Sequence, residues 1–275
     1  MRYVRYYDDN DTIRVGELNG DHVTPLTDIT TIDATTDTDR LAAADRDTGA
    51  RFPAGARRLA PVADPRRVFC VGLNYHAHVE ETRRELPTYP VLFTKFASAL
   101  IGAHDDIPLP PESEQVDYEG ELAVIIGRPG RRITPEDAPR HILGYSVAND
   151  ITMRDFQYKT HQWLQGKAWD NSTPLGPCLV TPDEIDLDSQ RITTTLNGEV
   201  LQSSTLDRLI FSIPQLISTV SGFTALQPGD VILTGTPGGV GHRRDPQLFL
   251  HSGDEITVEV TGIGKTHNRV VDEKL

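Results

Sequence analysis

The chain has 275 residues, and its 40 acidic and 27 basic residues give a formal net charge of −13. Hydrophobic residues make up 37% of the chain, so we expect a globular protein whose core needs no disulfide or structural metal. The negative charge, which no basic block offsets, argues against nucleic acids and anionic membranes as partners. No apolar run reaches the roughly 18 residues that a transmembrane helix needs.

The first residues contain no apolar stretch of the kind found in secretory signal peptides. The two cysteines, Cys70 and Cys178, lie far apart and lack metal-ligand spacing. We therefore expect reduced thiols and a cytoplasmic location.

The first 60 residues predict a small, strand-rich N-terminal domain. Residues 3–6 and 13–16 flank an acidic turn as in a hairpin, and Asn19-Gly20 marks a second turn. Residues 61–65, which begin and end with proline, are the predicted linker to a catalytic domain over residues 66–275.

The larger domain predicts a mixed, β-rich α+β fold with few helices. A short, exposed helix is expected over residues 75–86, a helical turn over 135–141 and an amphipathic helix over 210–222. The expected strands cover residues 68–72, 121–127, 142–149, 192–196, 200–201, 231–234 and 255–260, with a last strand near 270–271.

Three carboxylates are candidate metal ligands. Glu119 and Glu121 have the i, i+2 spacing that puts both on one face of a strand, next to an apolar run. Asp150 ends another apolar strand. Without a nearby His or Cys, such a set favours Mg²⁺ or Mn²⁺ over Zn²⁺. The alternative is an exposed acidic strand end and an aspartate that caps a turn.

Two further residues have the spacing of a catalytic pair. His78 and Glu81 lie three residues apart, on one face of a helical turn, and a glutamate that orients a histidine creates a usable general base. His76 and His78 could instead form a metal pair, or the helix could be a solvated one with incidental histidines.

Lys167 stands among small and apolar residues in a lysine-poor protein. Buried beside carboxylates, it could hold a substrate oxygen, although a surface loop is an equal alternative. Arg154 and Gln157 lie in the turn after Asp150. Residues 234–241 are glycine-rich and could present backbone N–H groups to an anion, but they lack nucleotide-binding spacing, and a plain glycine-rich hairpin is the simpler interpretation.

Together these segments resemble the fumarylacetoacetate hydrolase (FAH) superfamily, in particular its short acylpyruvate hydrolase and hydroxyheptadienedioate isomerase types. The resemblance covers about residues 66–271. It rests on GLNYHAHVEE (72–81), DYEGELAVIIG (117–127), GYSVANDITMRDFQ (144–157), QGKAWDNSTPLGP (165–177), LNGEVLQ (196–202), LQPGDVILTGTPGGVG (226–241) and GDEITVEVTGIGKTHNRV (253–270).

The resemblance implies a β-roll, a mixed sheet wrapped on itself, usually in a homodimer. It implies that Glu119, Glu121 and Asp150 bind Mg²⁺ or Mn²⁺, and that a short lid carries the His78–Glu81 dyad. The other matching positions are an active-site lysine and three substrate-side residues, namely Lys167, Arg154, Gln157 and Thr236.

The chemistry that the resemblance implies is cleavage of a C–C bond in an acylpyruvate-like diketo acid, through a metal-chelated 2-oxo acid and an enolate. The alternatives are isomerisation or decarboxylation of hydroxymuconate-type diacids or oxaloacetate, and dehydration of 2-keto-3-deoxy sugar acids. A non-catalytic metal or ligand binder is disfavoured, because no residue of the set is missing. His76 is a further candidate for a substrate contact, and residues 242–250 are candidates for the opposite wall of the site.

Overall fold

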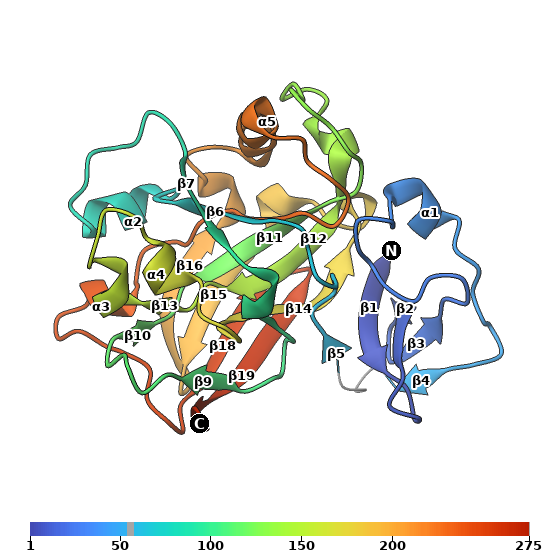
Figure 1. Cartoon of the computed structure of the whole chain (residues 1–275), viewed down its shortest axis with the longest axis horizontal. Coiled ribbons are helices and arrows are strands. Elements are labelled where there is room, and N and C mark those ends of the chain that lie inside the picture. Colours follow the sequence, from blue (N-terminus) through green and yellow to red (C-terminus); the bar gives the residue numbers. More distant parts are fainter. Residues whose placement is uncertain (54–57, 275) are drawn as a thin grey trace.

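The structure is a computed structural model that describes residues 1–53 and 58–274 (Figure 1). Residues 54–57, inside the predicted N-terminal domain, and residue 275 lie outside the described part. None of the helices in the described part is long and apolar enough to cross a membrane.

A large mixed sheet runs through the molecule. Ten of its strands form one continuous path, on which only β17 and β6 pair in parallel. In order they are β4 (Phe52–Pro53), β3 (His22–Pro25), β2 (Ile13–Asn19), β1 (Arg2–Tyr7), β14 (Thr173–Val180), β12 (Ile142–Asn149), β11 (Gly120–Ile126), β17 (Val231–Leu233), β6 (Val68–Gly72) and β7 (Val91–Lys95). Off this path, β5 (Arg58–Leu59) pairs with β1, and β8 (Leu100–Ile101) pairs with β14.

A second sheet lies against the first. Its strand order is β16 (Glu199–Thr205), β15 (Arg191–Leu196), β18 (Glu255–Val260), β19 (Gly264–Asp272) and β9 (Ile107–Leu109). A two-stranded ribbon joins β10 (Val116–Asp117) to β13 (Thr152–Met153). The sheets touch at Gly120, where an added Cβ would lie 2.3 Å from Thr194 Oγ1. Only glycine allows β11 to approach the second sheet this closely.

The helices are short and lie at the periphery. Figure 1 shows α2, α3 and α4 grouped on one side, with the N-terminal strands on the other. The α-helices are α1 (Thr38–Ala42), α2 (His76–Glu81), α3 (Arg154–Gln157), α4 (Leu164–Lys167) and α5 (Ile213–Phe223). The 3₁₀ turns are η1 (Ala97–Ala99), η2 (Ala138–His141), η3 (Pro182–Glu184), η4 (Leu187–Ser189), η5 (Leu206–Arg208) and η6 (Gly241–Arg243).

Strands β11 and β12 form the centre of the core. Every residue of both strands is buried, because each strand is covered on both faces. This is why their sequences are almost continuously apolar rather than alternating. An acidic side chain at the end of such a strand therefore lies in the protein interior instead of in water. The candidate site lies at these buried strand ends.

The predicted β-rich mixed architecture is confirmed, and most expected strands occur within one or two residues of their predicted bounds. The helix predicted over residues 75–86 is shorter, covering His76–Glu81, and it buries His78 and Val79 instead of being fully exposed. The glycine-rich segment after β17 is an irregular loop rather than a hairpin. The division into domains at residues 60 and 66 stays a prediction.

Candidate active site

One pocket gathers most of the predicted site residues. Its lining includes His78, Glu119, Glu121, Arg154, Gln157, Lys167 and Thr236. The two remaining members of the set adjoin it: Asp150 contacts Lys167, and Glu81 contacts His78. The fold therefore brings together His78, Glu81, Glu119, Glu121, Asp150, Arg154, Gln157, Lys167 and Thr236, although they come from segments far apart along the chain.

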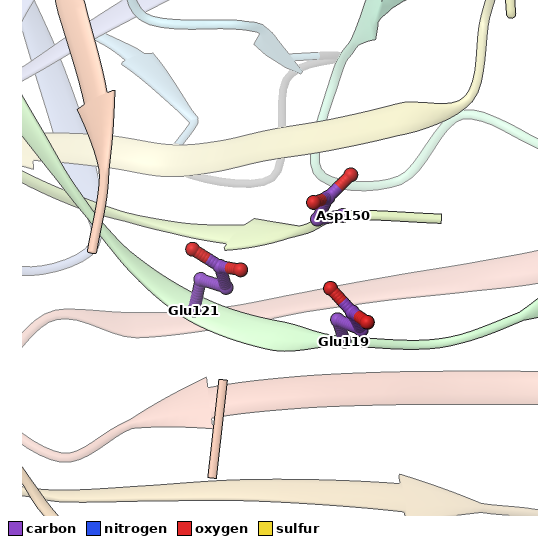
Figure 2. Close-up of side chains that lie close together, drawn as sticks. All are labelled: Glu119, Glu121 and Asp150. Carbon is purple, nitrogen blue, oxygen red and sulfur yellow. The ribbon is translucent and has the colours of Figure 1, made fainter. Parts of the chain in front are cut away.

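The three candidate metal ligands converge at the meeting point of β11 and β12. Figure 2 shows Glu121, in β11, and Glu119, directly before this strand, projecting from the same side of the chain toward Asp150. Gly120 pairs with Asn149, and the backbone N–H of Asp150 donates to the carbonyl of Glu119 at 2.8 Å. One carboxylate oxygen from each acid lies within 4.8 Å of the others, and all three residues are buried. The alternative of an exposed acidic strand end is therefore wrong.

Two buried lysines hold the carboxylate of Asp150 from both sides. Lys167 Nζ lies 2.8 Å from Oδ2 of Asp150 and 2.6 Å from Oε2 of Glu119. Lys95 Nζ donates to Oδ1 of Asp150 at 2.6 Å and to the carbonyl of Ile151 at 3.0 Å. The surface-loop alternative for Lys167 is therefore wrong. Burial lowers the pKa of Lys167, but Asp150 and Glu119 outweigh this effect and raise it, so the side chain stays an ammonium.

Arg154 forms the third cationic contact. Its Nη2 lies 2.6 Å from Oε1 of Glu119, its Nε donates to Asp117 at 2.8 Å and its Nη1 donates to Gln157 at 2.9 Å. Burial would raise the pKa of Glu119, but attraction to Lys167 and Arg154 outweighs burial and lowers the pKa to about 2. Glu119 is therefore an ionised ligand at any physiological pH.

Glu121 has the opposite electrostatic environment. Burial, followed by repulsion from Asp150 and Glu119, raises its pKa well above the ordinary value. Its Oε2 accepts a hydrogen bond from the backbone N–H of Gly235 at 2.7 Å, which offsets only part of this effect. The three acids can therefore all be ionised together only if a further cation joins them.

The donor set fits a hard divalent cation. The three ligands offer oxygen only, as Mg²⁺ and Mn²⁺ prefer. With every group ionised, the four buried carboxylates of the three ligands and Asp117 outnumber the buried cations of Lys95, Arg154 and Lys167 by one. A divalent cation would offset this excess of carboxylates.

The predicted dyad is assembled in this structure. His78 Nδ1 lies 2.6 Å from Oε1 of Glu81, and Oε2 of Glu81 accepts the backbone N–H of Gly239 at 2.7 Å. Because the pairing uses Nδ1, Nε2 is the ring nitrogen left for a substrate. His76, by contrast, is exposed and lines a different depression, so the metal-pair alternative and the expected substrate contact are both wrong.

The glycine loop, residues 234–242, is joined by hydrogen bonds to the acidic segment, residues 117–121. The backbone N–H of Gly235 donates to Glu121 (2.7 Å), and the N–H groups of Gly241 and His242 donate to Asp117 (2.8 and 3.0 Å). In the other direction, the hydroxyl of Tyr118 donates to the carbonyl of Gly239 (3.1 Å). Gln202 bridges the two segments, because it accepts from the N–H of Gly120 (3.0 Å) and donates to Thr236 (2.8 Å). The loop thus fixes the carboxylates, and its Gly239 also fixes the dyad.

Several residues of the site were missed from the sequence. Lys95 ends β7, Asp117 orients Arg154 and Gln202 links the glycine loop to β11. Asp117 stands two residues before Glu119, so its spacing alone could have marked it. Gln202 lies in the LNGEVLQ segment of the family resemblance but had no predicted role. Nothing near Lys95 in the sequence points to the site, because its partner Asp150 lies 55 residues away along the chain.

Residues 67–271 match the fumarylacetoacetate (FAA) hydrolase C-terminal family, and the chain belongs to this family. The chain is 48% identical over 216 residues to the oxaloacetate tautomerase FAHD2A, mitochondrial, of Bos taurus, a match that covers 78% of this chain and 69% of that protein. The human protein of the same name is 46% identical with the same coverage. Because these relatives are mitochondrial by name, they lend no support to the expected cytoplasmic location.

Solved structures match over almost the whole chain. The 5-carboxymethyl-2-hydroxymuconate delta-isomerase of Mycobacterium smegmatis is 34% identical, with a TM-score of 0.85, over 99% of this chain and all of that one. The fumarylacetoacetate hydrolase of Exiguobacterium antarcticum is 36% identical, with a TM-score of 0.87 and the same coverage. The predicted membership of the FAH superfamily and the predicted fold class are confirmed.

Proposed function

We propose that the protein is a divalent-cation-dependent tautomerase that interconverts the keto and enol forms of a 2-oxo diacid. The bovine and human relatives described above are named oxaloacetate tautomerases, and one matching structure is named a hydroxymuconate isomerase. These names support the isomerase alternative better than C–C hydrolysis. That this chain also acts on a 2-oxo diacid is part of the proposal.

The observation that carries the proposal is the buried trio Glu119, Glu121 and Asp150, with the imidazole of His78 lining the same pocket. Mg²⁺ or Mn²⁺ held by the trio would polarise the 2-oxo group and so make the protons on the neighbouring carbon more acidic. The trio and a base are the minimum that keto–enol exchange needs, because the reaction only moves a proton from carbon to oxygen.

His78 is the proposed base. Neutral at Nε2, it would take the proton from the carbon next to the 2-oxo group, and Glu81 would hold the ring and stabilise the imidazolium that forms. The backbone N–H of Gly239 keeps Glu81 in place for this role. Returning the proton to the substrate oxygen completes the exchange without another reactant.

Lys167 is proposed as a hydrogen-bond donor rather than a base, because its pKa is raised. Its ammonium would hold the substrate oxygen on which negative charge develops. Arg154, Gln157 and Thr236 line the same pocket and are the proposed partners of the substrate carboxylate.

Hydrolysis of an acylpyruvate is the second candidate. The observation in its favour is the complete His78–Glu81 pair at 2.6 Å, which could also deprotonate a water molecule. The two reactions share the trio and Lys167, so they differ in what the dyad deprotonates.

The test is a substrate panel with purified protein and Mg²⁺ or Mn²⁺. Enol decay of oxaloacetate, followed by ultraviolet absorbance, reports tautomerisation, and pyruvate release from acetylpyruvate reports hydrolysis. We expect tautomerisation that EDTA abolishes and that added Mg²⁺ restores. Metal-independent activity, or pyruvate release as the faster reaction, would overturn the proposal. The expected homodimer stays a prediction that light scattering can check.

A further inference from the structure

Two arginines line the exposed edge of the pocket, here called its mouth, in addition to the buried cations around the carboxylate trio, here called its floor. Arg84 and Arg243 both line the pocket, and both are exposed. Within the described residues neither guanidinium forms an ion pair with a carboxylate, although the protein has an excess of acidic side chains. We call these two residues the arginine rim. Unpaired arginines at the entrance of a small-molecule pocket are available for an anionic ligand.

Arg84 is held in position by an aromatic platform. It follows α2, and its guanidinium carbon lies 5.5 Å from the ring centroid of Trp163. The Trp163 ring is itself fixed: it packs edge-to-face on Phe93 at 5.6 Å, and it covers Gly72 so closely that an added Cβ there would lie 2.5 Å away. The stacking of Arg84 on a fixed ring restricts its guanidinium without neutralising it.

Arg243 is tied to the floor of the pocket through the backbone. It ends η6, whose Gly241 and His242 donate their N–H groups to the carboxylate of Asp117. Asp117 also binds Arg154, which contacts the metal-ligand candidate Glu119. The position of Arg243 is therefore set relative to the site, even though its side chain extends into solvent.

The charges distinguish the two ends of a substrate. The floor already combines buried carboxylates with the buried cations of Lys95, Arg154 and Lys167, whereas the two rim arginines are unpaired in the described part of the chain, so a second substrate carboxylate is better matched by the rim. Besides the arginine rim, the pocket lining includes apolar side chains, among them Phe93, Trp163 and Val240. A ligand in this pocket would thus meet the carboxylate trio with its cation, apolar side chains and the arginine rim.

From this arrangement we propose that Arg84 and Arg243 form a second anion subsite, which binds the distal carboxylate of the substrate and makes the enzyme selective for 2-oxo dicarboxylates over neutral-tailed 2-oxo acids. Arginine is suited to this task because its planar fork matches a carboxylate in two hydrogen bonds. The inference rests on the proposed function, since it assumes that the 2-oxo acid end of the substrate binds at the floor.

The test compares oxaloacetate with its 4-methyl ester, which keeps the 2-oxo acid end but has a neutral tail. For the wild-type enzyme with Mg²⁺ we expect the higher kcat/KM on the diacid. Arg84→Gln and Arg243→Gln should each raise KM for oxaloacetate about tenfold, as loss of a charged hydrogen bond does, and leave kcat within about twofold. Neither substitution should change KM for the ester.

The matched control is Arg83→Gln, which removes the same charge from the adjacent residue. Arg83 is exposed but does not line the pocket, so this variant should match the wild type on both substrates. All three arginines are exposed, so we expect the variants to melt at the temperature of the wild type. Equal melting temperatures would show that changes in KM do not come from unfolding.

Each other outcome overturns the inference in a distinguishable way. If the wild type turns over both substrates equally well, or if the rim variants weaken diacid and ester alike, the subsite is wrong while the tautomerase proposal stands. If the wild type turns over neither substrate, the proposed function fails and the subsite fails with it. If Arg83→Gln weakens oxaloacetate binding as much as Arg84→Gln, the effect is general attraction rather than a subsite.

Discussion

Lys95 donates a hydrogen bond to Asp150 at 2.6 Å, and both side chains are 0% exposed. Lys167 takes the other oxygen of the same carboxylate, so Asp150 cannot turn away from the site. Lys95 thus binds Asp150 as closely as Lys167 does, although Lys95 ends the edge strand β7 and Lys167 ends helix α4.

Lys95→Met should destabilise the protein strongly, because it leaves one oxygen of a buried carboxylate without its cation. We expect a loss of about 3 kcal/mol in the free energy of unfolding, measured by urea denaturation of the metal-free protein. Lys265→Met, on an exposed position of β19, is the matched control and should stay within about 0.5 kcal/mol of the wild type. Equal losses in the two variants would show that the ion pair contributes little.

The raised pKa of Glu121 predicts a pH dependence of stability in the metal-free protein. The folded protein keeps a proton on Glu121 that the unfolded chain releases above its ordinary pKa of 4.5, so this contribution to stability is complete below that pH and is lost as pH rises. Glu121→Gln mimics the protonated acid and should remove the loss. In EDTA, the variant should become progressively more stable than the wild type as the pH rises above about 5, as followed by thermal melting. A difference that does not change with pH would refute this account.

Removal of a ligand charge should stop turnover but not folding. Glu119→Gln and Asp150→Asn should each lower activity to near that of the EDTA-treated wild type, because each removes a charged oxygen ligand from the proposed cation. Calorimetric titration with Mn²⁺ should show weaker binding in both variants. Glu114→Gln, at an exposed acid five residues before Glu119, should leave both measurements unchanged. A ligand variant that keeps full activity in EDTA would disprove the metal assignment.

His78→Ala should lower kcat by about 10²–10⁴-fold, the usual contribution of a general base. Glu81→Gln should cost less, because it misorients the imidazole without removing it. His76→Ala is the control, since His76 lies on the same helix but is exposed outside the pocket. Tautomerisation and hydrolysis should be measured separately in each variant. Lost hydrolysis with intact tautomerisation would show that the dyad serves water activation only.

Gly239→Ala should impair both the dyad and the fold around it. Gly239 has φ +106°, and an added Cβ would lie 2.1 Å from the carbonyl oxygen of Leu201, so the glycine loop must shift. The shift would move the N–H group that Glu81 accepts. Gly253→Ala is a matched control, because Gly253 has φ +95° but nothing within 4 Å of its added Cβ. Both variants should lose about 1 kcal/mol or more of stability through backbone strain, but only Gly239→Ala should lose activity in assays well below its melting temperature.

The sequence allowed prediction of those parts of the site that depend on local spacing. The i, i+2 glutamates and the i, i+3 dyad are visible because a strand and a helical turn each have a fixed period. The contact of Lys95 with Asp150 was not visible, since the two residues are 55 positions apart and meet only through the pairing of strands. The same limit hid the role of Gln202.

The fold, like the site, could be predicted only where short stretches of sequence determine the local structure. Apolar strands such as β11 and β12 could be predicted from composition, and the Asn197-Gly198 turn correctly placed the β15–β16 hairpin. Strand β14 could not, because its sequence TPLGPCLV holds two prolines, which normally argue against a central strand. The helix expected over residues 75–86 ends at Glu81, because Thr82 caps it and Arg83 adopts a positive φ of 53° that a helix cannot continue through.

The position of β14 also bears on solubility. One side of this strand pairs with β12, and the other is covered by β8 near its beginning and by β1 near its end, where Arg2 pairs with Val180. A protein shortened to begin at residue 66 would therefore expose backbone N–H and C=O groups along an apolar strand in the middle of the sheet. Such an edge recruits strands from other molecules. We therefore expect the N-terminal strands, although remote from the candidate active site, to protect the protein from aggregation.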